Sequence, residues 1–247
     1  RSASAPCRSR SLDEGSSLKC DLCSVALLAS SLTAQPTGQL VQFIAFDACT
    51  ASTVTISSSN VSMASFVNNV LLVYSILDTA PAASSGCAFN VVGSNVSISS
   101  GLKNVAMFGF TAPVISSSRL SLTRTFIRAY SGESCRLIVF DAAIADSTVV
   151  VDTCDVLLAA TDGESSMQRM GSTAARVTHT LSRSLIVVRS QSSYAELLFA
   201  MGVVSNVQSS IRSTHCDVRS AITSQICGFN DAVSGATVTS SRSNLTV

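Results

Sequence analysis

A degenerate repeat of roughly 30 residues runs through most of this 247-residue chain. Its clearest copies, at 46–63, 140–158 and 229–247, place a Phe followed by Asp or Asn before two short runs of β-branched and aliphatic residues. A fixed period of about 20–50 residues is typical of solenoids, in which each copy buries its apolar face against the next one. The repeat therefore favours one elongated body over two separate globular domains.

The spacing of the repeat is most regular in the second half of the chain. Its anchor residues there lie 30, 30, 29 and 30 residues apart, and they are Phe110, Phe140, Met170, Phe199 and Phe229. Counting Phe46 and Phe89 as earlier anchors gives spacings of 43 residues before Phe89 and 21 after it. Solenoids tolerate such insertions and deletions as loops. We therefore expect loops at 78–86, 128–134 and 161–172, and we expect binding there.

Each copy holds three short apolar runs, as at 136–140, 148–151 and 155–159. Short runs rich in Val, Ile and Thr predict strands, and segments with a helical period are missing. Three strands per coil predict an all-β fold, a right-handed three-sided parallel β-helix with coils of roughly 21–33 residues. We assign 1–18 to a loosely ordered N-terminal segment and 19–247 to a single β-helix domain.

The chain begins at Arg1 and ends at Val247 inside the last copy of the repeat, so we expect a fragment of a longer solenoid. The longest apolar stretches, 24–34 and 70–77, are shorter than the roughly 18 residues of a membrane span. We therefore predict no membrane span in these residues, and an anchor would lie outside them. The net charge of +1 and the scattered Lys and Arg residues argue against a nucleic-acid partner.

One candidate acidic patch occurs in the sequence, with Arg124 or Arg128 one coil away, and its carboxylates are Asp141, Asp146, Asp152 and Asp155. Converging carboxylates of this kind could supply the acid and base of a polysaccharide-cleaving enzyme. Asn, Thr and Ser replace Asp at the same repeat positions elsewhere, however, and Asn and Asp suit sharp turns. We therefore favour a structural turn role for Asp141 and Asp155, which occupy such repeat positions, whereas Asp152 lies in a predicted strand where alternation could point it outward. We assign no catalytic residue.

The nine cysteines include a Cys20–Cys23 pair with metal-ligand spacing, but no second pair accompanies it. We predict no metal site and no cofactor. Cys154 and Cys216 are assigned to one repeat position with a copy between them, which would hold them about 9.6 Å apart, beyond the roughly 7 Å limit of a disulfide. We predict that both are free, buried thiols. Cys7 with Cys20 or Cys23 is the one local disulfide we would allow.

Three sequons for N-glycosylation begin at Asn60, Asn95 and Asn244, and they indicate a secretory route. Asn60 and Asn244 occupy repeat positions that stack on their equivalents in neighbouring coils, where we expect partial burial. The sequence therefore leaves open whether the sequons are glycosylated and whether most cysteines are reduced or oxidised.

The repeating Asn-Val-Ser and Phe-Asp-Ala units, the Ser, Val and Ala richness and the coil length, over about residues 40–247, resemble pectin-lyase-like β-helix proteins. In texture the chain is similar to the large surface-protein families of kinetoplastid protozoa, including the dispersed gene family. The resemblance implies an extracellular or cell-surface protein with an adhesive role. It also implies disulfide-bonded cysteines, from which the predicted free thiols depart.

We expect a non-enzymatic structural or adhesive β-helix segment that presents a binding surface for glycans or surface proteins. The alternative is a polysaccharide lyase or hydrolase of the pectin-lyase-like fold, which would need the four aspartates to converge on one exposed face. The placement of these side chains separates the two hypotheses.

Overall fold

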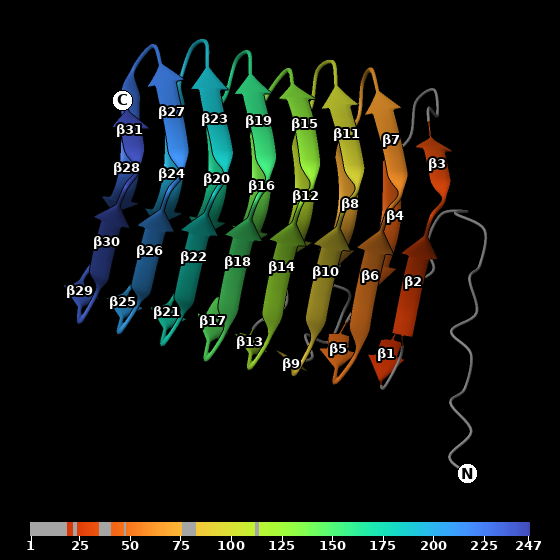
Figure 1. Cartoon of the computed structure of the whole chain (residues 1–247), viewed down its shortest axis with the longest axis horizontal. Coiled ribbons are helices and arrows are strands. Elements are labelled where there is room, and N and C mark those ends of the chain that lie inside the picture. Colours follow the sequence, from red (N-terminus) through yellow and green to blue (C-terminus); the bar gives the residue numbers. More distant parts are fainter. Residues whose placement is uncertain (1–18, 22–23, 35–40, 47, 76–82, 112–113) are drawn as a thin grey trace.

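The chain folds into a stack of parallel coils (Figure 1). Four parallel sheets form a β-solenoid of about seven turns, which confirms the all-β parallel β-helix expected from the repeat. No described residue belongs to a helix that could cross a membrane. The computed structural model describes residues 19–21, 24–34, 41–46, 48–75, 83–111 and 114–247. The predicted N-terminal segment 1–18 lies outside these ranges.

We name the sheets A to D in the order in which the chain enters them. Sheet A contains β1 (Lys19–Asp21), β5 (Ala48–Thr50), β9 (Ser84–Ser85), β13 (Val114–Ser116), β17 (Ala143–Ala145), β21 (Ala174–Ala175), β25 (Val204–Ser205) and β29 (Val233–Ser234). Sheet B contains β2 (Ser24–Leu28), β6 (Thr53–Ser57), β10 (Ala88–Val92), β14 (Arg119–Thr123), β18 (Thr148–Asp152), β22 (Thr178–Ser182), β26 (Gln208–Arg212) and β30 (Thr237–Ser241).

The other two sheets have the longer strands. Sheet C contains β3 (Ser31–Ala34), β7 (Asn60–Ser65), β11 (Asn95–Ser100), β15 (Phe126–Ser131), β19 (Asp155–Ala160), β23 (Leu185–Ser190), β27 (His215–Ser220) and β31 (Asn244–Thr246). Sheet D contains β4 (Val41–Phe46), β8 (Val70–Ser75), β12 (Val105–Phe110), β16 (Cys135–Phe140), β20 (Ser165–Met170), β24 (Tyr194–Ala200) and β28 (Thr223–Phe229).

Each complete coil therefore has four strands, whereas the sequence led us to expect three. The additional strand is the short one of sheet A, with two or three residues. In β13 and β17 only the central residue, Ile115 or Ile144, is buried in the core. A single inward residue leaves no apolar run that could be recognised as a strand in the sequence.

The coils are more regular than the anchor spacing suggested. Thr53 of β6 pairs with Ala88 of β10, so this coil has 35 residues, and the strands of sheet B repeat every 29 to 31 residues elsewhere. The expected range of roughly 21–33 is therefore corrected to 29–35. The spacing of 21 arose because Phe89 was taken as an anchor, but it lies in sheet B whereas Phe110 lies in sheet D.

Two of the three expected loops are strands joined by tight turns. The range 128–134 covers the end of β15 and the turn before β16, and the range 161–172 contains the whole of β20. The third, 78–86, falls partly outside the described residues. Binding surfaces are therefore better sought on the faces of the sheets.

Two residues in most coils adopt a left-handed backbone conformation, and they form two columns at the corners of the solenoid. At the corner between sheets A and B they are Ala51, Gly86, Ser117, Asp146, Arg176, Asn206 and Gly235. At the corner between sheets B and C they are Ala29, Ser58, Gly93, Arg124, Thr153, Arg183, Ser213 and Arg242. This conformation turns the chain sharply, and Asp146 is one of these turn residues.

A column of Ser, Thr and Cys follows the left-handed residues between sheets B and C, and it ties neighbouring coils together. Ser94 shows the pattern, because its hydroxyl donates to the carbonyl of Val92 at 2.9 Å and accepts the Ser59 N–H of the preceding coil at 3.2 Å. Such bonds satisfy backbone groups where the strands end. The column accounts for part of the high serine content.

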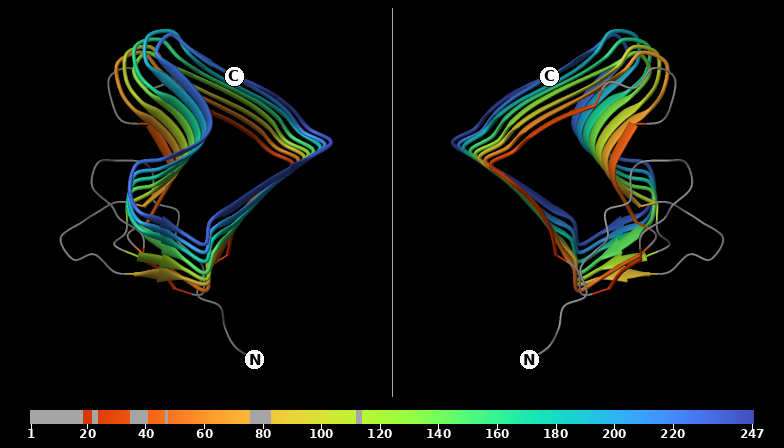
Figure 2. Two further views of the ribbon diagram at one scale, coloured as in Figure 1. Left: turned by 90° about the vertical axis from the view of Figure 1, so that its left-hand side faces the viewer. Right: turned by 90° about the vertical axis from the view of Figure 1, so that its right-hand side faces the viewer.

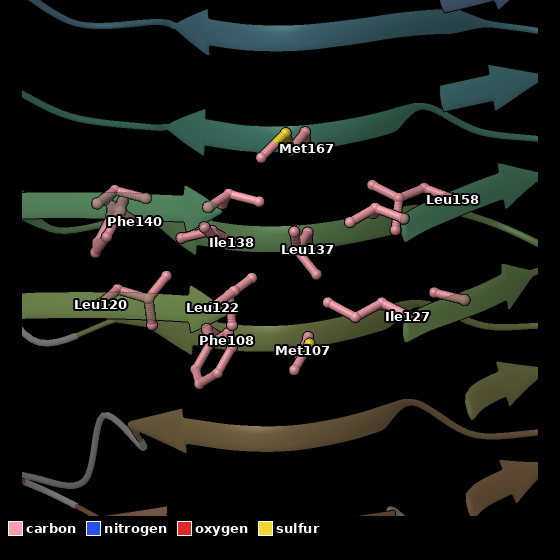
Figure 3. Close-up of a cluster of buried hydrophobic side chains, with 14 of the residues drawn as sticks. Met107, Phe108, Leu120, Leu122, Ile127, Leu137, Ile138, Phe140, Leu158 and Met167 are labelled. Atoms are coloured by element: carbon pink, nitrogen blue, oxygen red, sulfur yellow. The ribbon is translucent and has the colours of Figure 1, made fainter. Parts of the chain in front are cut away.

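The core is a continuous apolar column inside the solenoid (Figure 3). Phe110 and Phe140 stack with ring centroids 5.1 Å apart. Polar side chains are also buried inside the solenoid, and among them Nδ1 of His179 lies 2.7 Å from Oε1 of Gln168. Burial lowers the pKa of His179 to about 4, so its ring is neutral at physiological pH.

A disulfide that the sequence analysis did not predict joins Cys49 and Cys87, with their Cα atoms 6.2 Å apart. The two cysteines lie 38 residues apart in the chain, on neighbouring coils. A crosslink of this loop length stabilises a fold by about 4 kcal/mol through the unfolded chain. The pair was missed because the cysteines occupy different positions of the repeat.

Cys154 and Cys216 are free and buried, as predicted. They do not share a repeat position, however, because Cys216 pairs with Ile186 whereas the N–H of Cys154 bonds to the hydroxyl of Ser184. Cys7 and Cys23 fall outside the described residues. The prediction that both thiols are free is therefore confirmed, but the shared repeat position from which it was argued is wrong.

Candidate binding surface on sheet C

The outer face of sheet C changes character along the solenoid. Alternate residues of each strand point outward, because successive side chains of a strand lie on opposite faces. In β11 the outward residues are polar: Asn95, Ser97 and Ser99. In the three coils that follow, the outward residues are Phe126, Arg128, Tyr130, Asp155, Leu157, Ala159, Leu185, Val187 and Arg189. The apolar members therefore gather on three neighbouring strands.

We call Phe126, Tyr130, Leu157, Leu185 and Val187 the sheet C patch. Phe126, Tyr130 and Leu185 are 55%, 46% and 41% exposed, and the other two are half-buried. The patch covers about 10 Å along the solenoid axis and about 13 Å along the strands. Exposed apolar residues are ordinarily scattered singly over a protein surface, whereas these five form one group rimmed by polar residues.

An ion pair lies inside the sheet C patch. The Arg128 guanidinium donates to both carboxylate oxygens of Asp155 on the next coil, at 2.9 and 3.0 Å. This hydrogen-bonded contact raises the pKa of Arg128. Arg128 lies between Phe126 and Tyr130 on the outer face of the same strand, and its charged head is held by Asp155 of the next coil.

The far rim of the patch is charged. Asp217 of β27 accepts hydrogen bonds from Arg219 at 2.7 Å and from Arg189 at 3.3 Å. Burial disfavours the ionised carboxylate, but the bonds from both arginines outweigh it and lower the pKa of Asp217. Asp217 is therefore an anion at neutral pH, and the two arginines present the remaining positive charge to solvent.

The three sequon asparagines also lie on sheet C, where each is the first residue of its strand and points outward. Asn60, Asn95 and Asn244 are all exposed, which corrects the expected partial burial of the first and the last. Asn60 and Asn95 are register partners on neighbouring strands, about 4.8 Å apart. Asn95 is in turn the register partner of Phe126, so it borders the sheet C patch.

The four aspartates of the candidate acidic patch do not meet in one site. Asp146 bonds to Arg176 at 2.5 and 2.7 Å, at the corner where β18 begins. Asp152 bonds to Arg183 at the other end of β18, which places it about 20 Å from Asp146. Hydrogen bonds from these arginines lower the pKa of both carboxyls.

The remaining two aspartates of that patch do not complete a carboxylate cluster either. Asp155 lies near Asp152 at the same corner, but its carboxylate bonds to Arg128 of the preceding coil, whereas that of Asp152 bonds to Arg183 of the following coil. Asp141 is an exposed residue just after β16. Three of the four carboxylates therefore serve as links between coils.

The described residues offer little for metal or nucleophilic chemistry elsewhere. They contain no group of three His, Cys, Asp or Glu side chains that could hold a metal ion. Burial raises the pKa of Cys135 and of Cys216 to about 12 and that of Cys227 to about 11. These thiols are protonated at neutral pH and are therefore poor nucleophiles.

The sheet C patch was not predicted from the sequence. Its signal is present, because Phe126, Leu157 and Leu185 stand where other copies of the repeat have Asn or Ser. That signal requires the register of the strands to be known. Comparison with protein-family models, curated proteins and solved structures finds no match to this chain.

Proposed function

We propose that this chain is a non-enzymatic, adhesive β-helix segment of an extracellular or cell-surface protein, and that the sheet C patch is its binding surface. The observation that carries the proposal is the exposure of apolar side chains on three successive coils of a face that is polar on either side. The solenoid holds the patch in a fixed shape, so binding does not carry the entropy cost of ordering a flexible loop.

The composition of the patch favours a protein partner over a glycan. Tyr and Arg dominate the central, energetically important part of protein interfaces, and Tyr130 and Arg128 lie side by side here. The aliphatic side chains Leu157, Leu185 and Val187 add hydrophobic area that a hydroxyl-covered sugar would use less well. The patch itself is small, so Asn95 and Ser97 on one side and Arg189 and Arg219 on the other would form the polar rim.

The test is a plate-binding assay with laminin, fibronectin and collagen as probes, run beside a glycan array. The variant is Phe126→Asn/Tyr130→Ser/Leu185→Asn, whose new residues are those that sheet C carries at equivalent positions of β7 or β11. Leu102→Ser is the matched control, because Leu102 is an exposed leucine outside the patch. Circular dichroism and thermal unfolding check that each variant is folded.

We expect the wild-type chain and Leu102→Ser to bind a protein probe equally, and the triple variant to bind at least tenfold more weakly. Binding of a glycan that the triple variant loses would make the occupant a sugar. Equal binding by the triple variant would overturn the assignment of the surface. Release of oligosaccharides from polysaccharides incubated with the chain would establish the lyase or hydrolase alternative.

A further inference from the structure

Sheet D bends inward along its whole length, so its outer face is concave (Figure 2). The bend coincides with two consecutive buried residues in the middle of β8, β12, β16, β20 and β24, such as Leu137 and Ile138 of β16. On the outer side, Leu71, Ala106 and Val139 form an apolar cluster separate from the main core, and they are 8%, 8% and 5% exposed. Outward residues at the bend are therefore largely shielded from water.

Charged residues replace these apolar ones further along the concave face. Register pairing places Ala106, Arg136, Ser166 and Glu196 in one column on successive coils, and Val139 and Arg169 in the neighbouring column. Neighbouring members of a column are about 4.8 Å apart. Arg136, Ser166 and Arg169 consequently lie together on β16 and β20.

These two arginines share one carboxylate. Glu164, just before β20, forms ion pairs with both Arg136 and Arg169. The Nε atoms of both arginines and the Oγ of Ser166 are buried and have no hydrogen-bond partner among the described residues. Buried polar groups are nearly always paired, so three unpaired groups in one place indicate a missing partner. Two positive charges against one negative charge favour an anionic partner.

Glu196 borders this group on the next coil and is only 5% exposed. On the β20 side it faces Ser166, Glu164 and Arg169, and on the β28 side its register partner is the uncharged Gln225. No guanidinium lies within ion-pair distance of its carboxyl among the described residues. When ionised, Glu196 would repel an anion bound beside it.

We propose that Arg136, Ser166 and Arg169 form a binding site for an oxyanion of carboxylate or sulfate size, and that Glu196 admits the anion only when it is protonated. The guanidinium groups supply planar donors that match such oxyanions, and Ser166 supplies a hydroxyl donor. This site is on a different face from the sheet C patch and does not depend on it.

The structure indicates the pH at which this site changes. Burial, and secondly the charge of Glu164, raise the pKa of Glu196 to about 7, although Arg169 opposes the shift. With Glu196 protonated the cluster carries one excess positive charge, and with Glu196 ionised it is neutral. Anion affinity should therefore fall as the pH rises through about 7.

The test is isothermal titration calorimetry with inorganic sulfate at about pH 6 and pH 8, because sulfate keeps its charge over this range. We expect the wild-type chain to bind sulfate up to about tenfold more tightly at the lower pH, since the protonated fraction of Glu196 falls about tenfold. Glu196→Gln should bind tightly at both pH values. Arg136→Ala, which introduces the residue that β12 has at this position, should lose binding at both.

Arg176→Ala is the control, because it removes an arginine from an ion pair at a distant corner. Equal sulfate binding by Arg136→Ala and the wild-type chain would overturn the site. A pH dependence that persists in Glu196→Gln would overturn the role of Glu196. Parallel titrations with acetate and with a sulfated disaccharide identify which class of oxyanion the site prefers.

Discussion

The outer faces of sheets C and D are built from strands of nearly the same length, yet they present opposite surfaces. Leu185 on sheet C is well exposed, whereas Leu71 on sheet D is almost fully buried although it lies outside the main core. The difference comes from the backbone, because sheet D bends inward whereas sheet C does not (Figure 2). The bend of a sheet therefore decides how far its outward side chains at the bend are exposed.

The largest expected effect is a different response of the two faces to pH. The pKa of Glu196 on sheet D is raised from its ordinary value of 4.5 to about 7, so the folded chain holds a proton that the unfolded chain releases. The contribution of Glu196 to the free energy of unfolding is then fully present below about pH 4.5 and falls as the pH rises towards 7. On sheet C the pKa of Asp217 is lowered, so its contribution is present at neutral pH and is lost in acid.

Urea unfolding of the wild-type chain and of Glu196→Gln at about pH 5 and pH 8 measures this difference. We expect the free energy of unfolding of the wild-type chain to fall by about 2 kcal/mol more than that of the variant between these pH values. Parallel behaviour of the two proteins would show that Glu196 is solvated like an ordinary surface carboxyl. The predicted difference between sheets C and D in their response to pH would then be wrong.

A matched pair of leucines tests the concavity directly. Leu71→Ala on sheet D should lower the free energy of unfolding by about 2 kcal/mol, because it removes buried methyl groups. Leu185→Ala on sheet C should lower it by less than about 0.5 kcal/mol, because the side chain is mostly exposed. Equal costs in thermal or urea unfolding would contradict the different burial of the two faces.

The ion pairs of the two faces should differ, by a smaller amount, in how much they contribute to the free energy of unfolding. Arg136→Ala on sheet D removes one of the two partners of the shielded Glu164 and should cost about 1 kcal/mol. Arg128→Ala on sheet C breaks a more exposed pair and should cost about 0.3 kcal/mol. Urea unfolding at low salt measures both values. A larger cost for Arg128→Ala would reverse the ranking.

Much of the fold could be predicted from the sequence. The copies at 46–63, 140–158 and 229–247 were aligned correctly, since Thr148 and Thr237 lie in one column of sheet B and Asp155 and Asn244 in one column of sheet C. The strands of sheet A could not be predicted, because each contributes at most one inward residue. Phe89 was placed in the wrong sheet because an aromatic residue fits the core from sheet B as well as from sheet D.

The candidate sites could be predicted only in part. Repeat position favoured a turn role for Asp155, but Asp155 is the first residue of β19. Asp146 is the left-handed turn residue, and Asp152 and Asp155 link coils through arginines. The four glutamates are spread widely in the sequence, so nothing suggested that Glu164 and Glu196 lie near each other. Their approach depends on the registration of β20 and β24.

The sequence by itself determined that the chain is a parallel β-solenoid, because a period of about 30 residues filled with β-formers lets each coil bury its apolar residues against the next. The tertiary structure alone decided which outward residues are exposed, which cysteines pair and which charges meet. These properties depend on the bend of sheet D and on side-chain positions at the corners between coils. Neither is encoded in the order of residues within a single repeat.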